Sequence, residues 1–164
     1  LIQHVQLRQD IYLTCNKAVT GQRVIYTSDG SASNFLGKFG WSSATATRQR
    51  LATNYGPAKG YRTSSFRAEA YGMPSVLRFI FRSHEYTGLA YPKLIDIYSD
   101  SLSLVDTVNQ HRHFMKYYPN ATISTDWDIL QSIQHSLHQI STNINMLHVK
   151  GHQDRQRLRR QGVV

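Results

Sequence analysis

Three strand-like runs follow one another with only short links between them, and this feature limits the possible folds more than any other. They cover residues 23–28, 37–43 and 49–55. The first run is β-branched and aromatic and stops at Asp29-Gly30, a pair typical of turns. Strands joined by such short links pair with their neighbours as an antiparallel meander. The sequence therefore predicts three consecutive antiparallel strands.

A long helix is predicted after the meander. Ser64-Ser65 can cap its first turn, and Pro74 is predicted to kink it or to force a restart, because proline lacks a backbone N–H. Its apolar residues recur with the spacing of a buried helical stripe: Phe66, Ala70, Met73, Leu77 and Phe81.

Two more strands and two more helices complete the pattern. Residues 93–99 and 144–149 have the composition of strands, and a short helix is expected through residues 102–108. A longer helix is expected from Thr125, where Asp128 stands in the position of a capping box. This order predicts an α/β fold with a mixed five-stranded sheet, three antiparallel strands followed by parallel strands, flanked by helices.

The ends of the chain lack such patterns. We expect residues 1–20 to be a linker or lead-in segment, residues 21–154 to be one domain, and residues 155–164 to be a basic tail or a truncated end.

Cys15 is the single cysteine, and no apolar stretch nears the roughly 20 residues that span a bilayer. These features predict an intracellular protein, cytoplasmic or nuclear, that is not secreted and has no membrane partner.

The chain is strongly basic, with 19 Lys and Arg against 10 Asp and Glu and a formal net charge of +9. Such a charge favours a polyanionic partner, because phosphate contacts release condensed counterions. Charge alone does not identify nucleic acid, since many basic domains bind other partners.

Three of the ten carboxylates stand out by their positions. Asp29 and Asp100 each follow directly on an apolar strand, and Glu69 lies in the first turns of the helix between them. Taken singly, each has an ordinary explanation as a turn, a helix cap or a solvated side chain. If the two strands are neighbours, however, the three side chains converge at one edge of the sheet. Close carboxylates repel unless cations neutralise them, and such oxygen ligands suit Mg²⁺ or Mn²⁺.

Four ordered segments carry a resemblance to a known family. Residues 26–31 (YTSDGS), 66–70 (FRAEA), 97–101 (IYSDS) and 148–152 (HVKGH) resemble type 1 ribonuclease H domains. Further segments, including residues 126–130 (DWDIL) and 150–154 (KGHQD), resemble the ribonuclease H domains attached to reverse transcriptases of retrotransposon-like elements.

The resemblance implies a catalytic centre that cuts the RNA strand of an RNA–DNA hybrid with two Mg²⁺ ions, which Mn²⁺ can replace. It assigns metal binding and catalysis to Asp29, Glu69 and Asp100, and an auxiliary role to His152. It also implies a covalently attached reverse transcriptase or other polyprotein domain, and a domain that is monomeric. The residues that it places against the nucleic acid are Gly30, Ser31, Ser64 and Ser65. Arg67 and Lys150 are expected to bind nucleic acid as basic residues that can contact phosphates.

The sequence departs from the family at its last metal ligand. The family's fourth carboxylate belongs to a C-terminal helix about ten residues beyond His152, where this chain has Gly162, and residues 155–164 contain no acid. Asp154 is a weak substitute. The C-terminal helix is therefore expected to be missing, either because the chain is truncated or shifted in frame or because the ligand is lost.

Two other functions remain open at this stage. A degenerate ribonuclease H-like module would bind nucleic acid without cleaving it, and the missing fourth acid favours this alternative. A transposase or integrase nuclease would act on duplex DNA, but the early helical Glu69 and the Lys150-Gly151-His152 segment argue against it.

Overall fold

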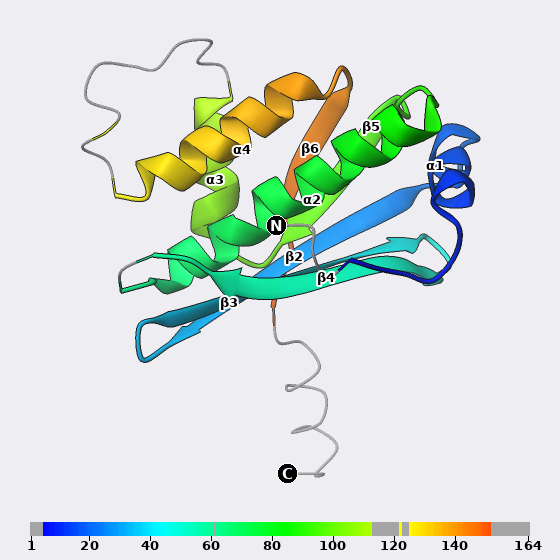
Figure 1. The fold of residues 1–164 in the computed structure, drawn as a ribbon. Helices are drawn as coiled ribbons and strands as arrows, with labels where there is room; N and C mark the ends of the chain where they lie inside the picture. Colours follow the sequence, from blue (N-terminus) through cyan, green and yellow to red (C-terminus); the bar gives the residue numbers. More distant parts are fainter. Residues whose placement is uncertain (1–4, 61, 113–121, 123–124, 152–164) are drawn as a thin grey trace, which may run out of the picture.

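A mixed sheet of six strands forms the centre of the structure (Figure 1). The computed structural model describes residues 5–60, 62–112, 122 and 125–151. The strands are β1 (Gln6–Leu7), β2 (Val24–Ser33), β3 (Leu36–Thr45), β4 (Arg50–Ala58), β5 (Leu94–Ser99) and β6 (Asn143–His148). The helices are α1 (Ile11–Val19), α2 (Ser65–Thr87), α3 (Leu102–His111) and α4 (Trp127–Gln139).

The order of the strands across the sheet is β1-β4-β3-β2-β5-β6. Strands β2, β3 and β4 pair antiparallel, and β5 joins β2 in parallel, with β6 parallel to β5 beyond it. The predicted α/β class and its three antiparallel strands followed by parallel ones are confirmed. The predicted count of five strands is wrong, because β1 adds a two-residue strand antiparallel to β4.

The segment before residue 21 also has more regular structure than its sequence indicates. Asp10 caps α1 by accepting hydrogen bonds from the backbone N–H of Tyr12 (2.8 Å) and Leu13 (3.3 Å). Thr14 and Cys15 are the buried residues of this nine-residue helix. Two buried positions are too few to give a periodic signal, which explains why we expected a linker or lead-in here.

Helix α2 is the central helix of the fold. It packs on β2 and β3, and α3 and α4 pack against it (Figure 1). Its first turn is capped by the Ser64 side chain, which accepts from the Arg67 N–H at 3.0 Å, and it ends at Gly88 in the left-handed conformation. Pro74 lies inside this continuous helix, so the predicted restart is wrong. The fully buried neighbours Met73 and Leu77 provide packing that offsets the lost backbone hydrogen bond.

The start of α4 differs from the prediction. Its N-cap is Asp126, which has a φ of 62°, and no side chain caps the helix there. Asp128 does not close a capping box with Thr125 but binds Arg67 of α2. Among the helices that the structure describes, none is long and apolar enough to span a membrane.

The cap of α1 gives a test of whether the first 20 residues belong to the folded unit. Asp10→Ala removes an acceptor shared by two backbone N–H groups, so we expect a loss of about 1 kcal/mol in the free energy of unfolding by urea. Asp106→Ala, at an exposed position inside α3, is the matched control and should change stability little. Equal stability of both variants would mean that α1 frays without affecting the domain.

Candidate metal centre

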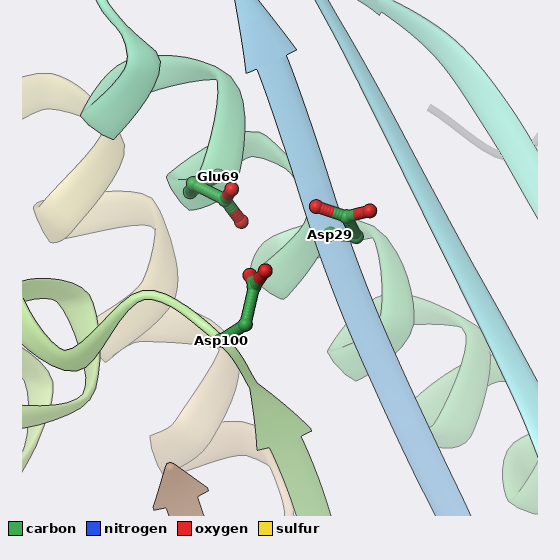
Figure 2. A group of neighbouring side chains, drawn as sticks. All are labelled: Asp29, Glu69 and Asp100. Atoms are coloured by element: carbon green, nitrogen blue, oxygen red, sulfur yellow. The ribbon is translucent and has the colours of Figure 1, made fainter. Parts of the chain in front are cut away.

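Three carboxylates from distant parts of the sequence meet at one edge of the sheet. Asp29 lies on β2, Glu69 on α2, and Asp100 directly after β5. One oxygen of each lies within 4.8 Å of an oxygen of the others. Figure 2 shows the three carboxyl groups pointing into a common space. The convergence expected from the sequence is therefore present.

The register of the two parallel strands places two of these carboxylates side by side. Ser28 of β2 pairs with Ser99 of β5. Asp29 follows Ser28 and Asp100 follows Ser99, so the two aspartates come directly after this pair. Strand β2 continues to Ser33, whereas β5 ends at Ser99. The edge of β2 is thus no longer paired with β5 at Asp29.

Gly30 brings α2 close enough for Glu69 to reach this edge. A Cβ atom at position 30 would overlap the backbone of Ala68 and Glu69, so only glycine permits this approach of strand and helix. The Gly30 N–H also donates a hydrogen bond to Glu69. Gly30 therefore positions the Glu69 carboxylate through its backbone.

The electrostatics of the cluster are compatible with a bound divalent cation. Burial, followed by the charges of Asp100 and Asp29, raises the pKa of Glu69 to about 8. One oxygen each of Glu69 and Asp100 is buried without a hydrogen-bond partner in the described part of the chain. Hard oxygen ligands left in this state fit Mg²⁺ or Mn²⁺, which would supply the missing positive charge.

Comparisons with known proteins identify the fold of the chain. No protein-family model matches the chain, and no curated protein matches it in sequence. Among solved structures, ribonuclease H1 from the archaeon Halobacterium salinarum matches with a TM-score of 0.56 and 15% identity, over 79% of this chain and 86% of that one. A ribonuclease H1 in complex with an RNA/DNA hybrid matches with a TM-score of 0.57 and 14% identity, over the same shares of the two chains.

A foamy viral protease-reverse transcriptase in complex with double-stranded DNA matches with a TM-score of 0.58 and 15% identity, over 85% of this chain and 90% of that one. The chain has the ribonuclease H fold. Within this fold, its three clustered carboxylates lie on β2, directly after the parallel strand β5, and on α2, which packs on β2.

The small polar residues expected at the nucleic acid lie on the two elements that carry Asp29 and Glu69, on β2 and at the start of α2. Ser31 is exposed on β2, two residues past Asp29. Ser64 and Ser65 are exposed at the start of α2, where Ser64 also caps the helix. Ser64 can cap the helix and still contact nucleic acid through the exposed side of the residue.

The segment after β6 approaches the same site. Lys150 is exposed, and Gly151 lies so close to Asp100 that a Cβ at position 151 would overlap its carboxylate. His152 and Asp154, the expected auxiliary residue and weak metal ligand, lie outside the described residues. The expected absence of a C-terminal helix falls on the same undescribed stretch.

Arg67 is held by contacts within the protein. Its Nη1 donates to Asp126 at 2.9 Å and to Asp128 at 2.8 Å, and its Nη2 donates to the other Asp128 oxygen at 2.6 Å. Its Nε donates to the Lys59 carbonyl at 2.8 Å. These contacts favour a structural role, tying α2 to α4 two residues before Glu69, over the phosphate contact expected from the sequence.

Sequence reasoning missed this link because Arg67 lies about sixty positions from its two partners. Asp126 and Asp128 have the usual appearance of negative charges in a first helical turn. Asp96, in contrast, lies inside β5 and outside the metal centre. Its oxygens accept from Arg23 (2.9 and 2.6 Å) and Asn145 (3.1 Å), which accounts for a buried carboxylate in mid-strand.

The raised pKa of Glu69 predicts how pH and metal affect stability. The folded protein holds this proton up to about pH 8, whereas the ordinary glutamate value is 4.5, so the free energy of unfolding of metal-free protein falls as pH rises between these values. At pH 8, Mg²⁺ at ten times its Kd should raise the Tm by about 3 °C. Differential scanning fluorimetry with and without Mg²⁺ measures this.

Glu69→Gln should lose both the pH dependence over this range and most of the Mg²⁺ effect. Glu85→Gln, at an exposed position on the same helix, should keep both. An unchanged Mg²⁺ response in Glu69→Gln would show that Glu69 does not hold the ion.

Arg67→Ala distinguishes the structural from the phosphate-binding role. Removing Arg67 leaves the largely buried Asp126 without its cation, so we expect a loss of about 3 kcal/mol in the free energy of unfolding. Arg82→Ala removes an exposed ion pair with Glu85 and should cost less than about 0.5 kcal/mol. A stable Arg67→Ala variant with weaker, less salt-dependent hybrid binding would restore the phosphate role.

Proposed function

We propose that this chain is a metal-dependent endonuclease that hydrolyses the RNA strand of RNA–DNA hybrids with two divalent ions. The observation that carries the proposal is the cluster of Asp29, Glu69 and Asp100 at one edge of a ribonuclease H fold, with carboxylate oxygens buried and unbonded. One of the structural neighbours is itself a ribonuclease H1 bound to an RNA/DNA hybrid.

The three carboxylates Asp29, Glu69 and Asp100 are proposed to hold the metal ions together. Glu69 and Asp100 would each offer a buried oxygen that has no hydrogen-bond partner among the described residues. When bound, two ions supply an activated water and charge neutralisation for the departing 3′-oxygen. Gly30 keeps Glu69 oriented through its N–H. His152 follows Gly151, which contacts Asp100, and is the candidate to move a proton beside the centre.

Recognition of the hybrid requires contacts to sugars and phosphates without reading the bases. The wide, shallow minor groove of a hybrid exposes 2′-hydroxyls on its RNA strand, which small polar side chains can reach. Ser31, Ser64 and Ser65 are exposed on β2 and at the start of α2, and Lys150 adds a positive charge next to Gly151. Arg67 would support this surface by holding α2 in place.

We further propose that the domain acts within a retroelement polyprotein, joined to a reverse transcriptase. The sequence segments that resemble such domains support this context, as does the match to a viral protease-reverse transcriptase. The partner would supply part of the affinity for the substrate. As a domain, this chain is proposed to act as a monomer.

A degenerate module that binds hybrids without cutting them is the second candidate. It is favoured by the lack of any acid in residues 155–164, where the family's fourth metal ligand is expected. Asp154 would have to replace that ligand for cleavage to persist.

Cleavage of labelled substrates tests the two candidates. The purified chain is incubated with RNA–DNA hybrid, duplex DNA or duplex RNA, in Mg²⁺, Mn²⁺ or chelator. We expect metal-dependent cutting of the hybrid alone, and Asp29→Asn should reduce it by roughly 100-fold or more, since even indirect supports of a metal site cost 10–100-fold.

The matched control is Asp106→Asn, which removes a carboxylate from an exposed position on α3 and should leave cutting unchanged. Hybrid binding without cutting would establish the degenerate module. Cutting of duplex DNA in preference to hybrid would contradict both candidates and support a transposase-like nuclease.

A further inference from the structure

A hollow lies at the tip of the β2–β3 hairpin, outside the metal centre. It has a volume of about 630 Å³ and is formed by β3, β4 and the segment that leads into α2. Its lining residues are largely aromatic, aliphatic or glycine. Phe39 lies buried among them, whereas Phe35, Leu36 and Tyr55 are 64%, 75% and 62% exposed. Large apolar side chains held this far into solvent at one hollow are typical of a binding site.

The exposed aromatic ring is held in place by its surroundings. Phe35 has a φ of 62°, a left-handed conformation that is unfavourable for a bulky residue. Its carbonyl accepts a hydrogen bond from the Thr63 N–H at 3.1 Å, and the Arg62 guanidinium lies 5.4 Å from its ring centroid. The hairpin tip is thus tied to the start of α2, and its ring is presented in a defined position.

The charge around the hollow is positive. Lys38 and Lys59 line it, Arg62 adjoins it over Phe35, and no Asp or Glu is among its lining residues. Within the described residues, no carboxylate forms an ion pair with Lys38 or Lys59. Aromatic walls rimmed by cations are the combination that binds single-stranded nucleic acid, through stacked bases and neutralised phosphates.

The hollow and the metal centre share the β2–β3 hairpin, which carries Asp29 and several residues that line the hollow. Lys38 pairs across the strands with Ser31, which lies two residues past Asp29 and points to the same side of the sheet. The length of β2 from Asp29 to the hairpin tip is roughly 17 Å, which corresponds to a few nucleotides of a nucleic-acid backbone. In Figure 1 the hairpin tip and the start of α2, which carries Glu69, lie at the same end of the molecule.

We propose that this pocket binds an unpaired nucleotide of the substrate, with its base against Phe35 and Tyr55 and its phosphates near Lys38 and Lys59. The inference rests on the proposed action on hybrids and adds a preference: hybrids flanked by a single-stranded segment bind more tightly than blunt ones. The absence of acidic lining residues favours this occupant over a basic or neutral protein partner.

Binding of extended and blunt hybrids tests the proposal. Fluorescence anisotropy of the whole chain in chelator compares a short blunt RNA–DNA hybrid with the same hybrid bearing about six unpaired nucleotides on either strand. We expect one of the extensions to raise affinity by roughly fivefold or more per stacked base. Phe35→Asn, which tolerates the left-handed turn, and Tyr55→Thr, which suits a strand, should each remove most of this gain.

Tyr86→Ala is the control, because Tyr86 is an 83% exposed aromatic residue near the other end of α2. It should keep the gain, and all three variants should bind the blunt hybrid as the parent chain does. As a measurement independent of the variants, 5-iodouracil placed in the extension should crosslink to Phe35 or Tyr55 on irradiation.

The outcomes separate this proposal from the proposed function. Cutting of blunt hybrid without any gain from an extension overturns the pocket and leaves the nuclease. An extension-dependent gain in a chain that never cuts overturns the nuclease and supports the pocket. A gain that Tyr86→Ala loses equally, or a self-association that Phe35→Asn abolishes, overturns the pocket as a nucleotide site.

Discussion

The close packing of three carboxylates is the constraint on which the rest of the structure depends. One oxygen each of Asp29, Glu69 and Asp100 lies within 4.8 Å of the others, and burial, followed by the charges of Asp100 and Asp29, raises the pKa of Glu69 to about 8. A chain folds into such a state only if packing elsewhere holds the three segments together. The parallel pairing of β2 with β5 and the close approach of α2 at Gly30 provide that packing. The fold thereby holds a negative pocket ready for a cation.

The cluster of three carboxylates could be predicted from the sequence because each carboxylate belongs to a pattern within its own short segment of the chain. An acid that follows an apolar strand-like run shows its pattern within a few residues, as Asp29 and Asp100 do in the sequence. In the structure Asp100 follows the end of β5, whereas β2 continues past Asp29 to Ser33 and pairs with β5 in parallel before it. The role of Gly30 in admitting α2 was not predictable, because a turn at Asp29-Gly30 gives the same sequence signal as a continuous strand.

The features that escaped prediction arise from long-range contacts or from short elements. Arg67 links α2 to two aspartates near the start of α4, and no local pattern connects residues so far apart. Strand β1 has two residues, and α1 buries two, so neither yields a period. Pro74 stays inside α2 because the helix is buried on several sides, whereas the expected break follows only from local backbone chemistry. Tertiary packing outweighs local preference in each case.

Charge balance explains how binding and cleavage could separate under the proposed function. Three carboxylates carry at most three negative charges against four positive charges on two Mg²⁺ ions, and the substrate phosphates contribute the remainder. Under the proposed function, Asp29, Glu69 and Asp100 would hold the ions with help from the substrate and from a fourth ligand, which residues 155–164, containing no acid, do not provide. A missing fourth ligand would weaken water activation before it weakened attachment of the hybrid, because the proposed polar and basic contacts to the hybrid belong to other residues.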